Sequence, residues 1–112
     1  MNLHPVERRS GLTRATFEAE YMSIGKPVIF TDLAAQWPAT KKWTFDWLRE
    51  NHGHLQVPLY DNDFRKPGKD YLTPKQKMPF GYYLDIIEAG PTDLRMFLYN
   101  IFKYAPDLCK DF

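Results

Sequence analysis

The spacing of apolar residues along the 112-residue chain predicts three amphipathic helices. Apolar side chains recur every three or four positions, as in a helix that buries one face, within residues 13–24, 45–52 and 79–89. Thr13 and Thr44 can cap the first turns of the first two segments, and Pro79 suits the first turn of the third. A glycine follows each segment, which is a common way for a helix to end.

Three other segments have the pattern of strands. Residues 28–30 and 94–102 are apolar on both faces, which predicts strands covered on both sides. Residues 55–60 alternate between apolar and polar positions, the period of a half-buried strand. Pro58 lacks a backbone donor and therefore favours the edge of a sheet for this strand.

The remaining segments are polar stretches and a last helix. Residues 1–11 are expected to be a polar lead-in to a single domain that spans residues 12–112. Residues 61–77 are predicted to form a long polar loop, and loops of this length are usually functional or disordered. Residues 105–112 predict a helix with three inward-facing side chains, Leu108, Cys109 and Phe112.

Composition narrows the possible functions. The 15 Lys and Arg residues nearly balance the 14 Asp and Glu residues, so bulk charge gives no reason to expect a DNA or membrane partner. A single cysteine excludes an internal disulfide and a multi-cysteine zinc site. The sequence contains no apolar run of the roughly 18 residues that span a membrane. Since the first residues also lack a secretory signal pattern, we expect a cytoplasmic protein.

The apolar segment 94–102 suggests a domain that needs further cover. Each large apolar side chain left in water would cost about 1.5–3 kcal/mol. Residues 105–112 then begin a helix that stops at an apolar Phe112. We therefore expect either an incomplete domain or one completed by a partner, with self-association through residues 94–102 as one form of completion.

Short motifs carry a family resemblance over residues 12–112. In chain order they are KPVIF at 26–30, WPA at 37–39, KWTFDWL at 42–48, VP at 57–58, MPF at 78–80 and PDL at 106–108. In this order and spacing they resemble the opening of the cupin-like (JmjC-type) domain family. The resemblance implies an α+β chain that forms the N-terminal helices and first strands of a cupin-like double-stranded β-helix, or jelly roll.

The resemblance also implies a chemistry. Active relatives bind Fe(II) and 2-oxoglutarate and hydroxylate a protein, an RNA or a small molecule. Their iron is held by an H-x-D/E motif and a later histidine, which leaves three coordination positions open. This sequence contains no H-x-D or H-x-E. We therefore assign no metal ligand and no catalytic residue, and expect the chain alone to bind no cofactor and to be inactive.

One residue that contacts the cofactor in relatives can be matched to a position in this sequence. Several relatives carry a tyrosine on the strand that matches residues 94–102, where its hydroxyl reaches the 2-oxoglutarate carboxylate. The matching residue here is Phe97, which has no hydroxyl. Tyr99 lies two residues further on, on the same face of a strand, and could take its place. Phe97 and Tyr99 are therefore the candidate pocket-facing residues.

The basic part of the polar loop is the candidate substrate entrance. Residues 64–77 carry five basic side chains and a single acid. Aromatic residues interleave with these charges, as on some surfaces that bind single-stranded nucleic acid. The candidates for this entrance are Arg65, Lys66, Lys69 and Tyr71. The alternative, which is usual for a run of charges, is a solvated surface.

Two further patterns have simpler interpretations. His52 and His54 would share a face on a strand and could bind a metal, but Gly53 indicates a helix end that is exposed to solvent. Residues 61–63 (DND) begin like a calcium loop, but position six is Lys66 and position twelve is Leu72, so a polar turn is favoured.

Three functions are consistent with the sequence, and the least favoured is an RNA-binding domain that uses the basic loop, because a net charge of +1 supplies little general attraction. The first is the N-terminal part of a JmjC-type oxygenase, which contributes one wall of the pocket. The second is a stand-alone protein-interaction module in which a partner strand completes segment 94–102 by strand addition.

Overall fold

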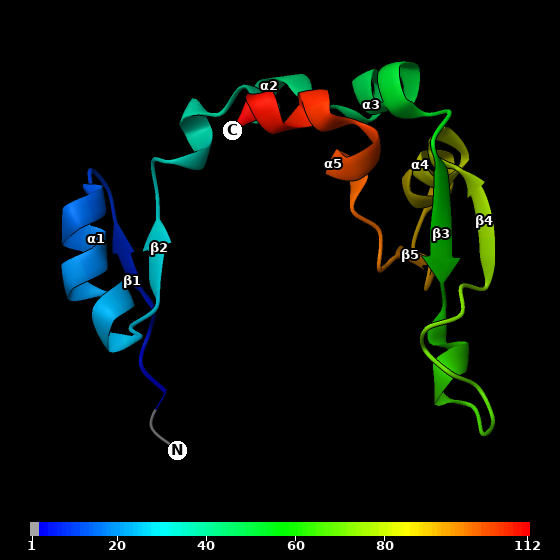
Figure 1. The fold of residues 1–112 in the computed structure, drawn as a ribbon, viewed down its shortest axis with the longest axis horizontal. Helices are drawn as coiled ribbons and strands as arrows, with labels where there is room; N and C mark the ends of the chain where they lie inside the picture. Colours follow the sequence, from blue (N-terminus) through cyan, green and yellow to red (C-terminus); the bar gives the residue numbers. More distant parts are fainter. Residues whose placement is uncertain (1–2) are drawn as a thin grey trace. The chain divides into compact units, whose positions relative to one another are not determined.

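The computed structural model describes residues 3–112, which form two compact units (Figure 1). One unit consists of residues 3–41 together with Phe112, and the other of residues 42–111. The chain combines helices with short strands, so the predicted α+β class is confirmed. Within residues 3–112 no helix is long and apolar enough to cross a membrane.

The first unit contains a strand that the sequence did not suggest. Strand β1 (Glu7–Arg9) pairs in parallel with β2 (Val28–Phe30), and helix α1 (Arg14–Glu20) connects them. The lead-in predicted for residues 1–11 is therefore wrong for β1, while residues 1 and 2 lie outside the described part. Polar side chains stabilise this strand, because Glu7 accepts a hydrogen bond from Lys26 at 2.7 Å.

The interior of the first unit is small. Phe17 of α1 packs against Phe30 of β2, with ring centroids 5.3 Å apart, and Tyr21 is buried. Ile29 is 38% exposed, so the prediction that this strand is covered on both faces is wrong. A single helix can cover only one face of a two-stranded sheet, so the other face of this sheet is exposed. The unit also includes η1 (Met22–Ile24) and η2 (Ala34–Gln36), and α2 (Pro38–Lys42) ends at its boundary.

The second unit is built on a three-stranded antiparallel sheet. Strand β3 (Gln56–Tyr60) lies between β4 (Gln76–Pro79) and β5 (Arg95–Met96). Strand β3 is therefore central, and the prediction of an edge position is wrong. Part of β4 falls within residues 61–77, which were predicted to be loop throughout.

The position of Pro58 explains how a central strand accommodates a proline. The carbonyl groups of Leu55 and Leu59 accept hydrogen bonds from the β4 side, so the nitrogen of Pro58 faces the β5 side. Strand β5 pairs only with Leu59 and Tyr60. The ladder on that side therefore begins after Pro58 and requires no donor from it.

The core of the second unit forms where helix α4 (Phe80–Ala89) covers the sheet. Four buried side chains make up its centre: Val57, Leu59, Phe80 and Leu84. The alternation predicted for residues 55–60 is confirmed at Val57 and Leu59, which are fully buried, and is wrong at Tyr60, which was placed on the polar face but is only 8% exposed. Helix α3 (Phe45–His52) packs beside α4, and Arg49 bridges them through ion pairs with Asp85 and Glu88.

The C-terminal segment differs most from its prediction. Only Arg95–Met96 of the predicted strand 94–102 is a strand. The backbone turns at Leu98, whose φ of 52° lies in the left-handed region. Asn100 then caps helix α5 (Ile101–Tyr104) by accepting a hydrogen bond from the backbone N–H of Phe102 at 3.1 Å. Local capping by a polar side chain has overridden the apolar pattern.

The last helix is a 3₁₀ helix, η4 (Pro106–Asp111). Leu108 is buried as predicted, but Cys109 is exposed and Phe112 is 53% exposed, so their inward placement is wrong. A 3₁₀ helix has three residues per turn, which places Leu108 and Asp111 on one face. The carboxylate of Asp111 is buried there and accepts hydrogen bonds from Lys42 and Trp43.

Thr44→Ala is expected to destabilise the second unit by about 1 kcal/mol. The Thr44 hydroxyl oxygen accepts a hydrogen bond from the backbone N–H of Trp47 at 3.1 Å, and alanine leaves that donor without its partner. Urea unfolding followed by circular dichroism measures the loss. Thr44→Ser keeps the acceptor and should remain within a few tenths of a kcal/mol of the parent. Equal losses for both variants would contradict the capping role.

Candidate functional site

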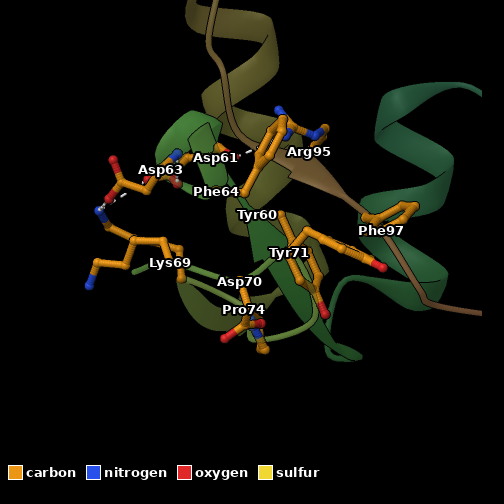
Figure 2. Close-up of a pocket in the computed structure, with 11 residues that line it drawn as sticks. Tyr60, Asp61, Asp63, Phe64, Lys69, Asp70, Tyr71, Pro74, Arg95 and Phe97 are labelled. Carbon is orange, nitrogen blue, oxygen red and sulfur yellow. Dashed lines mark hydrogen bonds and ion pairs between the residues drawn. The ribbon is translucent and has the colours of Figure 1, made fainter. Parts of the chain in front are cut away.

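A pocket of about 450 Å³ lies where β3 ends (Figure 2). Its aromatic residues are Tyr60, Phe64, Tyr71 and Phe97. Its charged residues are Asp61, Asp63, Asp70, Lys69, Lys75 and Arg95. The walls therefore come from the end of β3, the following loop, and the segment that contains β5.

Arg95 of β5 holds the start of the loop against the sheet. The loop opens with the short helix η3 (Asn62–Arg65), which Asp61 caps by accepting a hydrogen bond from the backbone N–H of Asp63. Arg95 donates one hydrogen bond to the Asp61 carbonyl at 2.9 Å and another to the Asn62 side chain at 3.2 Å. These bonds fix the position of η3 relative to β5.

Four charged groups form a cluster next to η3, and three of them, Asp61, Asp63 and Lys75, line the pocket. Lys75 lies 3.0 Å from Asp61 and 2.8 Å from Asp63, and Lys66 lies 2.5 Å from Asp63. Hydrogen bonds from Lys66 and then Lys75 lower the pKa of Asp63 to about 2. The backbone N–H of Asp63, and then Lys75, lower the pKa of Asp61. Both carboxylates are thus ionised and neutralised by lysines at neutral pH.

Lys66→Gln is expected to raise the pKa of Asp63 from about 2 towards its ordinary value of 3.8, by roughly one unit. The lowered pKa means that this ion pair stabilises the fold above about pH 3.8 and that the contribution is lost as the pH falls towards 2. NMR titration of the Asp63 carboxyl carbon gives the value directly. Lys69→Gln is the matched control, because Lys69 has no ion pair within residues 3–112. An unchanged Asp63 titration in Lys66→Gln would contradict this assignment.

The loop around Tyr71 is held by a turn. Asp70 accepts hydrogen bonds from the backbone N–H groups of Leu72 and Thr73, each at 2.7 Å. The hydroxyl of Tyr60 donates to the Leu72 carbonyl at 3.1 Å and ties this turn to β3. Tyr71 is 63% exposed, so the turn presents its ring at the pocket without burying it.

The aromatic residues do not all have free faces. Arg95 lies over the ring of Phe64 at 5.3 Å, and Arg65 lies 5.8 Å from the centre of the same ring. Tyr60 and Phe97 form a perpendicular pair with centroids 5.5 Å apart. Tyr71 has no ring or cation contact within the part of the chain that the structure describes. Its ring is therefore available to a ligand.

Comparison with known proteins identifies the family. A model of the cupin-like domain matches residues 14–110. The chain belongs to the cupin-like domain family. It is similar to two proteins of Arabidopsis thaliana, lysine-specific demethylase JMJ30 and lysine-specific demethylase JMJ21. The predicted resemblance to cupin-like, JmjC-type domains is confirmed.

The two relatives are much longer than the region they share with this cupin-like chain. The first match is 34% identical over 89 residues, which is 79% of this chain and 19% of JMJ30. The second is 35% identical over 107 residues, which is 96% of this chain and 10% of JMJ21. The chain thus spans about a fifth of one relative and a tenth of the other.

The pocket of this cupin-like chain contains three of the residues selected from the sequence. Phe97, Lys69 and Tyr71 line it, whereas Arg65 and Lys66 lie outside its lining. Tyr99 lines a second pocket, of about 460 Å³, where its ring stacks on that of Tyr104. Because the strand ends at Met96, Phe97 and Tyr99 do not share a face as predicted. What these residues bind stays a prediction.

Sequence reasoning missed several residues of the pocket. Tyr60 and Arg95 both help to shape it, and neither belongs to a recognisable motif. The available signal for Tyr60 was its polar-face position in the alternating strand 55–60. The available signal for Asp61 and Asp63 was the DND sequence, which forms the capped turn that was favoured over a calcium loop.

Family membership implies Fe(II) and 2-oxoglutarate for a complete domain, but the donors of this cupin-like chain do not fit the iron. Within residues 3–112 no three His, Cys, Asp or Glu side chains cluster as metal ligands. His52 is buried against the Trp47 ring, contrary to the predicted solvent-exposed helix end, whereas His54 is exposed. The nearest carboxylate oxygen to the Nε2 of His52 belongs to Asp107, at 3.7 Å. We therefore derive no iron-dependent step from this chain.

Proposed function

We propose that the chain forms one part of a JmjC-type, Fe(II)- and 2-oxoglutarate-dependent hydroxylase. In this proposal it supplies the first helices, the first strands and one wall of the substrate pocket. The iron ligands come from residues outside this chain. The observation that carries the proposal is the cupin-like match over residues 14–110, with both relatives named as lysine-specific demethylases.

The chain's own residues are consistent with a role in substrate binding, with the iron ligands supplied by residues outside this chain. The sequence has no H-x-D or H-x-E motif, and its two neighbouring histidines face different surroundings. The pocket at the end of β3 combines aromatic walls with charged groups. Such a wall can bind and orient a substrate, but it provides no group that would activate oxygen.

The first experiment reads the coding DNA beyond the Phe112 codon. The proposal expects the frame to continue into an H-x-D/E motif and a later histidine. The extended product is then assayed with Fe(II) and 2-oxoglutarate, and succinate is measured by mass spectrometry. A variant of that product in which the motif histidine and acid are both alanine serves as the control. Absence of the motif, or equal turnover by the variant, would contradict the proposal.

A second experiment uses the 112-residue chain itself. We expect it to form no succinate and to bind Fe(II) only weakly, at millimolar concentrations or above. Isothermal titration calorimetry with Fe(II) under anaerobic conditions measures the binding. Stoichiometric, tight Fe(II) binding by this chain would contradict the proposal that the iron ligands come from residues outside it.

The alternative proposal is an interaction module completed by a partner strand. The observation that favours it is the short strand β5, which is followed by Phe97 and Leu98, exposed by 44% and 60%. A stable, cooperative monomer would support an independent module, and a concentration-dependent dimer would support self-association through residues 94–102. Analytical ultracentrifugation and thermal unfolding distinguish these results from aggregation, which would favour the hydroxylase proposal.

A further inference from the structure

The charged groups of the pocket divide into paired and unpaired sets. Asp61 and Asp63 are neutralised by Lys75 and Lys66, as the distances above show. These four groups therefore contribute little net charge to the cavity. The net charge that a ligand meets depends on the remaining ionic groups of the lining, which are Lys69, Asp70 and Arg95.

The unpaired set is positive overall. Arg95 donates its hydrogen bonds to backbone carbonyls and to the Asn62 amide, and thus has no carboxylate partner within residues 3–112. Lys69 has no ion pair in the same described range. The carboxylate of Asp70 is occupied by the backbone of Leu72 and by Thr73. The lining as a whole has three acids and three bases, but within residues 3–112 Lys69 and Arg95 have no carboxylate partner, so the pocket offers cationic groups that can contact an anionic group of a ligand.

The aromatic side of the pocket provides ring faces for stacking. Tyr71 and Phe97 are 63% and 44% exposed, and both line the cavity. In the view of Figure 2 Phe97 lies on the right and Lys69 on the left, with Tyr60 and Tyr71 between them. The pocket thus has an aromatic region and a cationic group at separate places on its wall.

We propose that this pocket binds a nucleotide group, in which a planar base stacks on Tyr71 and the phosphate contacts Lys69. A volume of about 450 Å³ lies in the range of sites for small ligands and accommodates one nucleotide. Bases of any kind stack on tyrosine and phenylalanine, and phosphate is a usual partner of unpaired lysine and arginine. The proposal is independent of the proposed hydroxylase, because neither iron nor 2-oxoglutarate takes part in the binding.

Two sources can supply this group: a free nucleotide, or one nucleotide of a single-stranded RNA. The chain carries a formal charge of only +1, so general attraction to RNA is weak and the binding should depend on the pocket. Both sources present the same base and phosphate to Tyr71 and Lys69. They differ in whether neighbouring phosphates extend beyond the cavity.

The test measures binding by the whole 112-residue chain. The probes are AMP, GMP, CMP and UMP, titrated by calorimetry, and a fluorescein-labelled RNA of about eight nucleotides of mixed sequence, followed by anisotropy. We expect saturable binding at one site. Tyr71→Ala should weaken it by roughly tenfold, whereas Tyr71→Phe keeps the ring and should retain the affinity. Lys69→Gln should weaken it severalfold and reduce its dependence on salt.

Matched controls come from outside the pocket. Tyr82 of α4 is 65% exposed, so Tyr82→Ala removes an equally exposed tyrosine. Lys110→Gln removes an exposed lysine of η4. Both controls should bind like the parent chain. Circular dichroism spectra of all variants check that the fold is retained.

The outcomes separate the two sources and can overturn the proposal. Binding of mononucleotides but not RNA identifies a free nucleotide as the ligand, and binding of RNA alone identifies a strand. The proposal is overturned if neither probe binds below about 1 mM, or if Tyr71→Ala binds like the parent. It is also overturned if inorganic phosphate or polyglutamate competes as well as a nucleotide, since that would show a basic patch or a peptide site.

Discussion

Leu59→Ala is expected to lower the free energy of unfolding of the second unit by about 2–5 kcal/mol. Leu59 is fully buried on the central strand β3 and packs in one cluster with Val57, Phe80 and Leu84. Alanine removes apolar area and leaves a cavity beneath α4 that a central strand cannot close by moving. Since domains of this size are stable by only about 5–15 kcal/mol, the variant should lose much of its stability.

Urea unfolding, monitored by far-ultraviolet circular dichroism, measures this loss. Leu72→Ala is the matched control, because Leu72 is 60% exposed and should change stability by less than about 0.5 kcal/mol. A loss below about 1 kcal/mol for Leu59→Ala would show that the packing of α4 on β3 does not form the core.

The helices could be predicted because their signals are local. Thr13 and Thr44 both cap their helices through the side-chain oxygen, as the sequence suggested. Helix α4 begins directly after Pro79, which belongs to β4 and not to the helix as predicted, and ends before Gly90. The first helix was predicted over residues 13–24 but ends at Glu20, and residues 22–24 form the 3₁₀ helix η1. In each case the deciding contacts lie within a few residues, and a single sequence contains all of the required information.

The strands were harder because their partners lie far away in sequence. Strand β1 is polar and short, and its pairing with β2 depends on residues about 20 positions later. Segment 94–102 has the composition of a strand, yet only Arg95–Met96 finds a partner, and it does so on β3. Apolar composition indicates burial, but it does not say whether a neighbouring strand is available.

At the candidate site, too, residues with local sequence signals could be predicted, and residues whose role depends on distant contacts could not. Lys69 and Tyr71 could be selected because basic and aromatic residues interleave in one long loop. Arg95 could not, because its role arises from hydrogen bonds to Asp61 and Asn62, more than 30 positions earlier. The separation of Phe97 from Tyr99 follows from the backbone turn at Leu98, which the apolar pattern does not reveal.

Gly53→Ala is expected to destabilise the second unit by about 1–3 kcal/mol, although its backbone would ordinarily favour alanine. Gly53 has φ −59° and ψ −20°, a right-handed helical conformation in which replacing glycine by alanine usually adds about 0.4–1 kcal/mol of stability. Here a β-carbon would collide with the carbonyl oxygen of Arg49, which already accepts the Gly53 N–H at 3.0 Å. The collision should therefore reverse the sign.

The same glycine also joins the two helices, which makes the cost hard to relieve. The Gly53 carbonyl accepts a hydrogen bond from the Gly81 N–H at 2.9 Å, where the end of α3 meets the start of α4. Any shift away from Arg49 strains this bond. Gly81→Ala is the control, since its β-carbon would lie 3.3 Å from a side-chain carbon of Arg49 and 3.4 Å from Gly53, contacts that small movements can relieve. If urea unfolding shows Gly53→Ala to be the more stable variant, the helices do not approach as closely as the structure places them, and chain entropy decides the result.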